Sequence, residues 1–153
     1  MPPGLTTRTP GLLAWLRLAR VFQKAQRASA VQLRCSGLSP AQFDVLAHVG
    51  ADEGLPQQRL ADGLLVTKGN ICQILDKMEQ RGLIERRPAG RVNQAYLTAA
   101  GRHLFDQVVP QHEGFMAEQF AVLSDAEQAE LLRLLRHLDQ RLAGGNTPDG
   151  PSV

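Results

Sequence analysis

The segment 56–81 most constrains the fold, because it predicts two short helices with almost no chain between them. Apolar residues at helical spacing lie on one side of a first helix over roughly residues 56–64. After the connection Leu65-Val66, Thr67 is the N-cap of a second helix that Gly82 ends. Two helices joined this closely must cross at a steep angle, so we predict a helix-turn-helix arrangement.

The second helix of this pair has one apolar face and one polar face. The apolar face consists of Ile71, Ile74, Leu75 and Met78. The polar face suits a helix inserted in a major groove, where Asn, Gln and Lys can pair with base edges, although an ordinary solvated face has the same pattern. The candidate DNA-binding residues on this helix are Thr67, Lys68, Gly69, Asn70, Cys72, Gln73 and Lys77.

A β-hairpin is predicted directly after the helix pair. Residues 83–87 and 91–97 partly alternate apolar and polar residues, and Pro88-Ala89-Gly90 between them is a turn signal. Arginines on a ribbon beside a helix-turn-helix fit contacts to phosphate or the minor groove. As an isolated cluster, the same residues would more often be plain surface. The candidate DNA-binding residues here are Arg86, Arg87 and Arg91.

Helices are also predicted on both sides of this region. The first begins at Thr9-Pro10, and a second begins at a capping box formed by Ser39 and Gln42. After the hairpin, Thr98 caps a helix whose Pro110 should bend or break it. A last helix, opened by a capping box at Ser124, carries a leucine stripe at coiled-coil-like spacing.

Composition indicates one ordinary globular domain of 153 residues, with 43% hydrophobic and 21% charged residues. The two cysteines, Cys35 and Cys72, form no CxxC pair, which argues against a disulfide framework or a zinc knuckle. The scattered histidines predict no metal site, and we expect no cofactor. No catalytic motif is recognisable, so an enzyme is not expected. Since neither a signal peptide nor a membrane-spanning run is evident, we expect a cytoplasmic protein.

Charge is distributed unevenly along the chain. Residues 59–97 carry seven Lys and Arg against four acidic residues, whereas residues 98–153 carry four against eight. The first region could approach a polyanion and the second would be repelled by it. An imbalance of this size is weak evidence by itself.

Five ordered motifs together resemble the MarR family of winged helix-turn-helix regulators. The likeness extends over roughly residues 12–142, and its strength lies in the ordered set. The motifs are Gly37–Leu46, Leu64–Ile71, Leu75–Glu79, Gly82–Arg87 and Tyr96–Gly101.

The resemblance implies a mainly α fold with a small β-hairpin wing, and a homodimer that binds double-stranded DNA. Residues of about 10–36 and 99–143 would form the dimerisation helices and about 39–98 the winged lobe, with 1–8 and 144–153 expected to be disordered. It also implies a repressor relieved by a small aromatic or phenolic ligand. Such ligands usually bind in a cleft beside the dimer region, which makes Trp15 and His48 candidate ligand-binding residues.

Two departures from the family pattern bear on DNA recognition. The wing, residues 88–94, is shorter than usual and lacks an Asp-x-Arg tip, and only Arg91 matches the second arginine of that motif. On the recognition helix, Cys72 and Gln73 stand where relatives often have Ser or Thr followed by Arg. We therefore expect a different preferred operator and more phosphate contact by the wing.

Two alternatives stay open on the sequence alone. The short wing is compatible with a winged-helix interaction module that has lost operator binding. A thiol-based redox-sensing regulator would need a low thiolate pKa at Cys72, for which Lys68 one turn away offers mild help. Salt-dependent binding to upstream DNA would separate a DNA-binding regulator from the interaction module.

Overall fold

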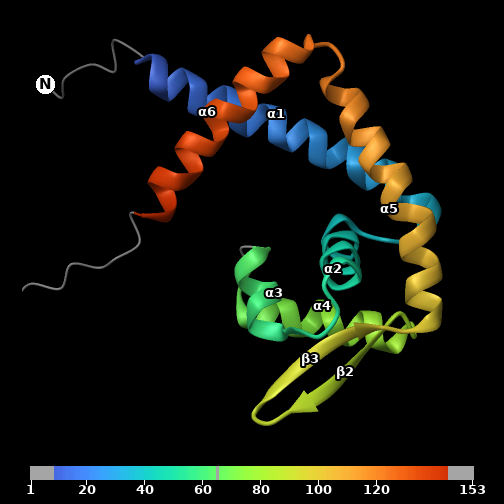
Figure 1. The fold of residues 1–153 in the computed structure, drawn as a ribbon. Helices are drawn as coiled ribbons and strands as arrows, with labels where there is room; N and C mark the ends of the chain where they lie inside the picture. Colours follow the sequence, from blue (N-terminus) through green and yellow to red (C-terminus); the bar gives the residue numbers. More distant parts are fainter. Residues whose placement is uncertain (1–8, 65, 145–153) are drawn as a thin grey trace, which may run out of the picture. The chain divides into compact units, whose positions relative to one another are not determined.

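The computed structural model, which describes residues 9–64 and 66–144, is mostly helical with one small sheet (Figure 1). This confirms the predicted fold class of a mainly α protein with a β-hairpin wing. A single 3₁₀ turn, Arg34–Ser36, joins the first two helices. The remaining elements, in chain order, are α1 (Pro10–Leu33), α2 (Pro40–Ala51), β1 (Leu55–Pro56), α3 (Gln57–Gly63), α4 (Lys68–Gln80), β2 (Ile84–Ala89), β3 (Val92–Leu97), α5 (Ala99–Phe120) and α6 (Asp125–Ala143).

One hydrophobic core holds the helix-turn-helix and the hairpin together. It is built from the C-terminal end of α1, from α2, α3 and α4, from the inner residues of the sheet, and from Val108 and Val109 of α5. The predicted apolar face of α4 is confirmed, since Ile71, Leu75 and Met78 are fully buried and Ile74 is 9% exposed. Burying each such side chain stabilises the fold by roughly 1.5–3 kcal/mol. The largest of the fully buried side chains are those of Leu33, Val45, Leu46, Val49, Leu60, Ile71, Leu75, Met78 and Ile84.

The sheet has three antiparallel strands in the order β1-β3-β2, one more than the sequence predicts. Strand β1 pairs Leu55 with Ala95 of β3, and a two-residue strand is too short to display an alternating pattern. The turn of the hairpin also differs from the prediction. Strand β2 continues through Pro88, which an edge strand tolerates, so the turn is Gly90-Arg91, with Gly90 at φ 65°.

The predicted helix starts are confirmed by hydrogen bonds at the N-caps. Ser39 and Ser124 each complete a capping box, in which the serine hydroxyl accepts from a backbone N–H and the third residue's side chain accepts from the serine N–H. The Thr67 hydroxyl accepts from the Asn70 N–H at 3.1 Å, and the Thr98 hydroxyl accepts from the Gly101 N–H at 3.0 Å. These local signals depend on neighbours in sequence, which is why they could be recognised without the fold.

Helix α5 runs unbroken through Pro110, so of the two predicted outcomes, a bend or a break, the break is wrong. Pro110 removes one backbone hydrogen bond, but Val108, Val109 and His112 around it are buried and hold the helix in place. At its start, a Cβ on Gly101 would collide with the Leu83 carbonyl oxygen, so α5 lies directly on the chain that precedes β2.

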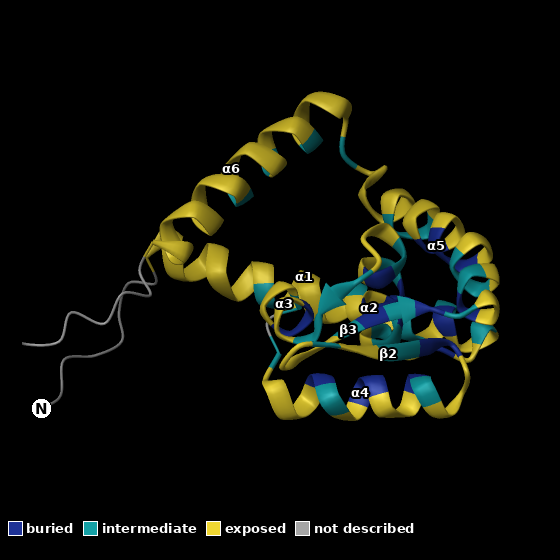
Figure 2. Cartoon of the chain, turned by 60° about the horizontal axis from the view of Figure 1, so that its bottom comes forward, coloured by how far each residue is buried: buried dark blue, intermediate teal, exposed yellow. Residues whose placement is uncertain are grey.

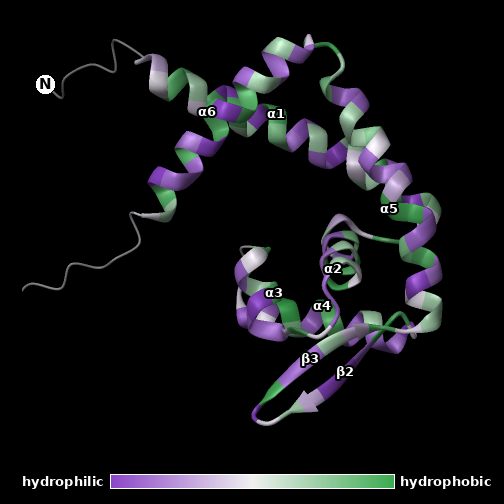
Figure 3. Ribbon diagram, viewed as in Figure 1, coloured by the Kyte–Doolittle hydropathy of each residue, from purple (hydrophilic) through white to green (hydrophobic). Residues whose placement is uncertain are grey.

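The described residues up to Met116 form one compact unit, and those from Ala117 to Gly144 form a second, which contains α6. Each unit contains a helix whose apolar residues are exposed (Figures 2 and 3). In α1 the exposed apolar residues include Leu12, Trp15, Leu16 and Phe22, and in α6 they include Leu134, Leu138 and Leu142. A long apolar stripe left exposed in this way is typical of a helix that contacts another chain.

Some predictions fall on residues outside the described ones, namely the disorder of residues 1–8 and 145–153. Gly144 is described and is the C-cap of α6. No helix within residues 9–64 and 66–144 is both long and apolar enough to cross a membrane. Within the same ranges, no three His, Cys, Asp or Glu side chains are grouped so that they could hold a metal ion.

Candidate nucleic-acid interface

Helix α4 presents its polar face to solvent on the side opposite the core, as Figure 2 shows by its exposed outer edge. The N-cap at Thr67 sets where the helix begins, and the buried isoleucines and leucine fix its rotation. As a result, six of the predicted DNA-binding residues are exposed together along the outer side and its flanks. They are Thr67, Lys68, Gly69, Asn70, Gln73 and Lys77.

Cys72 differs from these six because it is half-buried. The side-chain amide of Gln57, at the start of α3, donates to the Cys72 sulfur. This contact ties the two helices of the helix-turn-helix together, and it turns Cys72 toward α3. Sequence reasoning did not single out Gln57, because only the folded arrangement brings residues 57 and 72 together.

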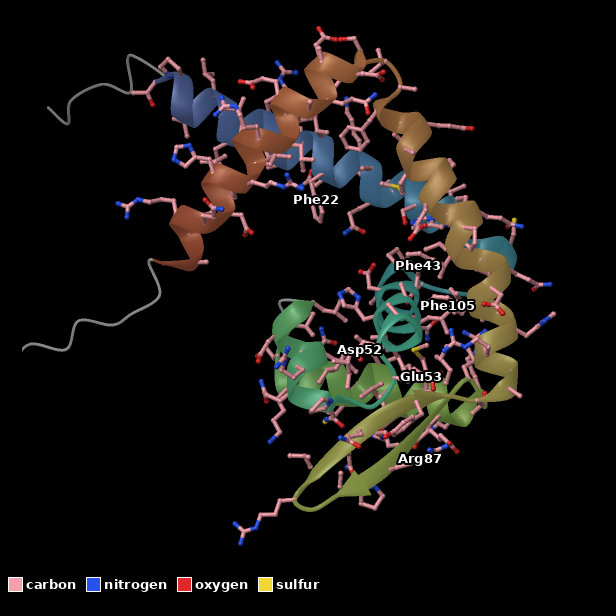
Figure 4. All side chains as sticks on the ribbon, in the orientation of Figure 1. Phe22, Phe43, Asp52, Glu53, Arg87 and Phe105 are labelled. Carbon is pink, nitrogen blue, oxygen red and sulfur yellow. The ribbon has the colours of Figure 1, made fainter. Side chains whose placement is uncertain are left out.

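The wing arginines have different surroundings. Arg87, labelled in Figure 4, pairs with Glu85 on the same strand. Its guanidinium carbon lies 4.2 Å from the centre of the Tyr96 ring. Arg91 is exposed in the turn and pairs with no acidic residue among those that the structure describes. Of the predicted wing contacts, Arg91 is therefore the one whose charge is free to reach a ligand.

Arg86 is held by two acidic residues of α4. Its backbone N–H and its Nε each donate to the Glu79 carboxylate, at 2.9 and 3.0 Å, and its terminal nitrogen contacts both Glu79 and Asp76. Hydrogen bonding from Arg86 lowers the pKa of Glu79, and the same bonds raise the pKa of Arg86. The arginine predicted to contact phosphate is thus already engaged within the protein.

The predicted ligand-binding residues lie in different places. His48 lines an open groove of about 530 Å³ between α2 and α3, and its Nδ1 lies 2.8 Å from the Asp44 carbonyl oxygen. Trp15, on α1, is 63% exposed and does not line this groove. The other residues that line the groove are Ala51, Asp52, Leu55, Arg59, Asp62 and Gly63.

A buried polar cluster was also missed by the sequence analysis. His112 of α5 is 6% exposed, and its two ring nitrogens lie 3.2 Å from the Ser29 hydroxyl and 2.7 Å from the Gln32 amide oxygen of α1. Its ring packs 4.2 Å from the Phe43 ring of α2. Since an amide oxygen can only accept, Nδ1 carries the proton and Nε2 accepts from Ser29. Three helices meet at this histidine.

Comparison with known proteins identifies the family. A family model described as the MarR family matches residues 36–92, which extend from the end of the 3₁₀ turn before α2 into the wing. An uncharacterised HTH-type transcriptional regulator of Bacillus cereus is 33% identical over 128 residues, covering 83% of this chain and 87% of the relative.

Solved structures show the same fold. The MarR family protein RV2887 of Mycobacterium tuberculosis, solved in complex with salicylic acid, is 28% identical, with a TM-score of 0.66 over 87% of this chain and 98% of that one. The S. aureus MepR-DNA complex is 18% identical, with a TM-score of 0.76 over 83% of this chain and 96% of that one. Together with the helix-turn-helix, the wing and the ordered motifs, these similarities establish that the chain belongs to the MarR family of transcriptional regulators.

Proposed function

We propose that this protein binds double-stranded DNA sequence-specifically, with the N-terminal half of α4 in the major groove. The observation that carries this proposal is the exposed polar face of α4 from Thr67 to Lys77, whose opposite face is locked in the core. A helix fixed on one side and polar on the other can enter the groove without losing its position in the lobe. MepR, which has the same fold and was solved in complex with DNA, supports DNA as the partner.

Individual contacts follow from the side chains on this face. Asn70 and Gln73 can form paired hydrogen bonds to base edges, and Lys68 and Lys77 can contact phosphates. Gly69 has open space where a Cβ would stand, so the DNA backbone can approach the start of the helix closely. Arg91 at the wing tip supplies a further phosphate contact.

We further propose a homodimer whose two lobes bind successive half-sites. Exposed apolar residues on α1 and on α6 give each protomer the surface for a second copy. A two-fold symmetric pair would then require a palindromic operator with half-sites about one helical turn, or 34–36 Å, apart. Since DNA is the partner, we expect the protein to act in the cytoplasm.

The regulatory part of the proposal is repression that a small aromatic or phenolic effector relieves. The relative RV2887, solved with salicylic acid, supports this class of ligand. Arg59 brings a guanidinium donor to the groove between α2 and α3, where the carboxylate of an aromatic acid could be held, and His48 lines the same groove. Trp15 stays a candidate on α1, outside that groove.

Fluorescence anisotropy with DNA from upstream of the gene tests the DNA-binding proposal. Gln73→Ala and Asn70→Ala should each reduce discrimination between operator and unrelated DNA, because a base-edge pair contributes about 1–3 kcal/mol of discrimination. Gln80→Ala, at the exposed far end of α4, is the matched control. If the wild type bound operator and unrelated DNA equally, or Gln73→Ala changed neither affinity nor discrimination, the proposed reading face would be wrong.

A further inference from the structure

The two adjacent arginines of strand β2 are bound to different parts of the lobe. Arg87 pairs with Glu85 two residues away on the same strand, and its side chain is 59% exposed. Arg86 crosses from the strand to α4, where it contacts Glu79 and Asp76, and its side chain is 20% exposed. Only the second arrangement links the wing to the helix proposed to enter the major groove.

The link between Arg86 and α4 is made by the backbone as well as by the side chain. Glu79 accepts from the Arg86 N–H at 2.9 Å and from its Nε at 3.0 Å, so one carboxylate fixes both the strand and the guanidinium. The terminal nitrogen then bridges Glu79, at 2.5 Å, and Asp76 one turn earlier on α4. A planar guanidinium can hold two carboxylates at once, whereas a lysine ammonium lacks this fork.

The charges explain why such a link matters for binding a polyanion. Asp76 and Glu79 are 53% and 34% exposed on the recognition helix, where unpaired carboxylates would repel phosphates. Arg86 pairs with both carboxylates and offsets one of their two negative charges. The charge of Arg86 is therefore paired with carboxylates of α4 and is not available to DNA phosphates.

We propose that Arg86 is a positioning residue that fixes the wing against the recognition helix through Glu79 and Asp76, and that it does not itself contact phosphate. This inference rests on the proposed DNA binding by α4. It replaces the expectation from sequence that Arg86 behaves like Arg91. Glu79 and Asp76 are acidic residues beside a DNA-binding face, yet by holding Arg86 they favour specific binding.

Two consequences separate positioning from phosphate contact. Loss of a phosphate contact lowers the slope of log affinity against log salt by about 0.9, whereas loss of a positioning contact leaves the slope nearly unchanged. In addition, Arg86→Lys would preserve a phosphate contact, because lysine is itself a good phosphate ligand. It would not preserve the two-carboxylate bridge.

The most direct test is the double variant Glu79→Gln/Arg86→Gln, which breaks the link without changing net charge. We expect operator affinity to fall about tenfold relative to unrelated DNA, because a displaced helix loses about one base-edge contact. The salt slope should stay within about 0.3 of the wild type, well short of the 0.9 expected for a lost phosphate contact. Arg86→Lys should lose most of the same discrimination, and thermal unfolding should verify that each variant is folded at the assay temperature.

The single variant Glu79→Gln separates the positioning role from a simple effect of charge on affinity. Removing a negative charge near DNA should tighten binding if only charge matters, but it should weaken operator discrimination if Glu79 holds Arg86. Glu85→Gln is the matched control, since that carboxylate pairs with Arg87 and does not reach α4. It should tighten binding slightly or leave it unchanged.

Several outcomes would overturn the inference. If the double variant bound the operator with the affinity and discrimination of the wild type, the positioning role of Arg86 would be wrong. The proposed function would not be affected. A slope change near 0.9 in Arg86→Ala together with normal binding by Arg86→Lys would show that Arg86 is a phosphate contact. A wild-type protein without salt-dependent operator binding would instead overturn the proposed function, and this inference with it.

Discussion

The winged lobe and the two helices α1 and α6 use their apolar residues in different ways. Within the lobe, α4 buries Leu75 and Met78 completely. Along α1 and α6, apolar side chains stay exposed, up to 63% at Trp15 and 75% at Leu142. The lobe therefore completes its own core, and it can hold a DNA-binding face steady. The apolar stripes of α1 and α6 are the surface that the proposed second copy would cover.

The largest expected effect comes from comparing the same substitution in the two regions. Leu75→Ala should lower the free energy of unfolding by about 2–5 kcal/mol, because it leaves a cavity in a closed core. Leu138→Ala, at a residue that is 54% exposed, should have a smaller effect that depends on protein concentration. Denaturant unfolding at several concentrations measures both. Equal effects independent of concentration would mean that the stripe of α6 is covered within its own chain.

The next prediction concerns the second copy itself. Leu138→Asp should raise the dimer dissociation constant by at least about a hundredfold, because the dimer would bury an unpaired carboxylate. Light scattering at micromolar concentration should then detect monomer, and operator affinity should fall with it. Gln140→Asp introduces the same charge two residues away, on another side of α6, and should leave the dimer intact. A wild type that is monomeric at micromolar concentration would refute the dimer.

The difference between the two regions also explains what the sequence could predict. The buried face of α4 and the caps at Ser39, Thr67 and Ser124 depend on spacing within one helix, so local patterns were sufficient. The stripes on α1 and α6 indicated burial, but an amphipathic pattern cannot distinguish a partner within the chain from one outside it. The stripes alone therefore predict an interface, whereas the expected partner, a second copy of the chain, comes from the family resemblance.

Contacts that cross between elements could not be predicted. Glu79 and Arg86 are seven residues apart, and they meet only because Gly82, at φ 70°, turns the chain from α4 into β2. The buried contact of His112 with Ser29 joins residues 83 apart in the sequence. For these residues the sequence gives the types of side chain but not which side chains meet in the fold. This is why Arg86 was expected to contact phosphate.

The buried histidine gives a prediction for the junction of α1, α2 and α5. Burial lowers the pKa of His112, although the Asp44 carboxylate of α2 opposes this shift. The unfolded chain, with a histidine pKa of about 6.5, therefore binds more protons than the folded protein as pH falls below that value. Stability should decrease from about pH 6.5 downward, and His112→Gln should remove much of this dependence.

Denaturant unfolding between pH 5 and 8, at one protein concentration, measures this effect. His103→Gln, the same substitution at an exposed histidine of the same helix, is the control. Burial also raises the pKa of Asp44, which contributes a dependence of the opposite sign at lower pH, above the usual carboxylate value of about 3.9. An identical pH profile for His112→Gln and the wild type would show that His112 is not the titrating group.

The smallest expected effect is at the wing tip, where the lobe provides least support. Arg91 lies in the two-residue turn after Gly90, exposed and without an acidic partner among the described residues, so it should contact phosphate rather than the minor-groove floor. Arg91→Ala should reduce affinity modestly and lower the salt slope by about 0.9. Arg87→Ala is the matched control, because Arg87 is already bound to Glu85 and Tyr96 and should shift the slope less.

Titrations at several salt concentrations, on operators with and without an A-tract flank, would measure this effect. An arginine that reads a narrow minor groove gains from the strong negative potential of an A-tract, whereas one bound to backbone phosphate does not. We therefore expect Arg91→Ala to weaken binding to both operators by the same factor. A loss confined to the A-tract operator would show that the short wing enters the minor groove. In that case Arg91, without support from the lobe's core, would still contribute to sequence preference.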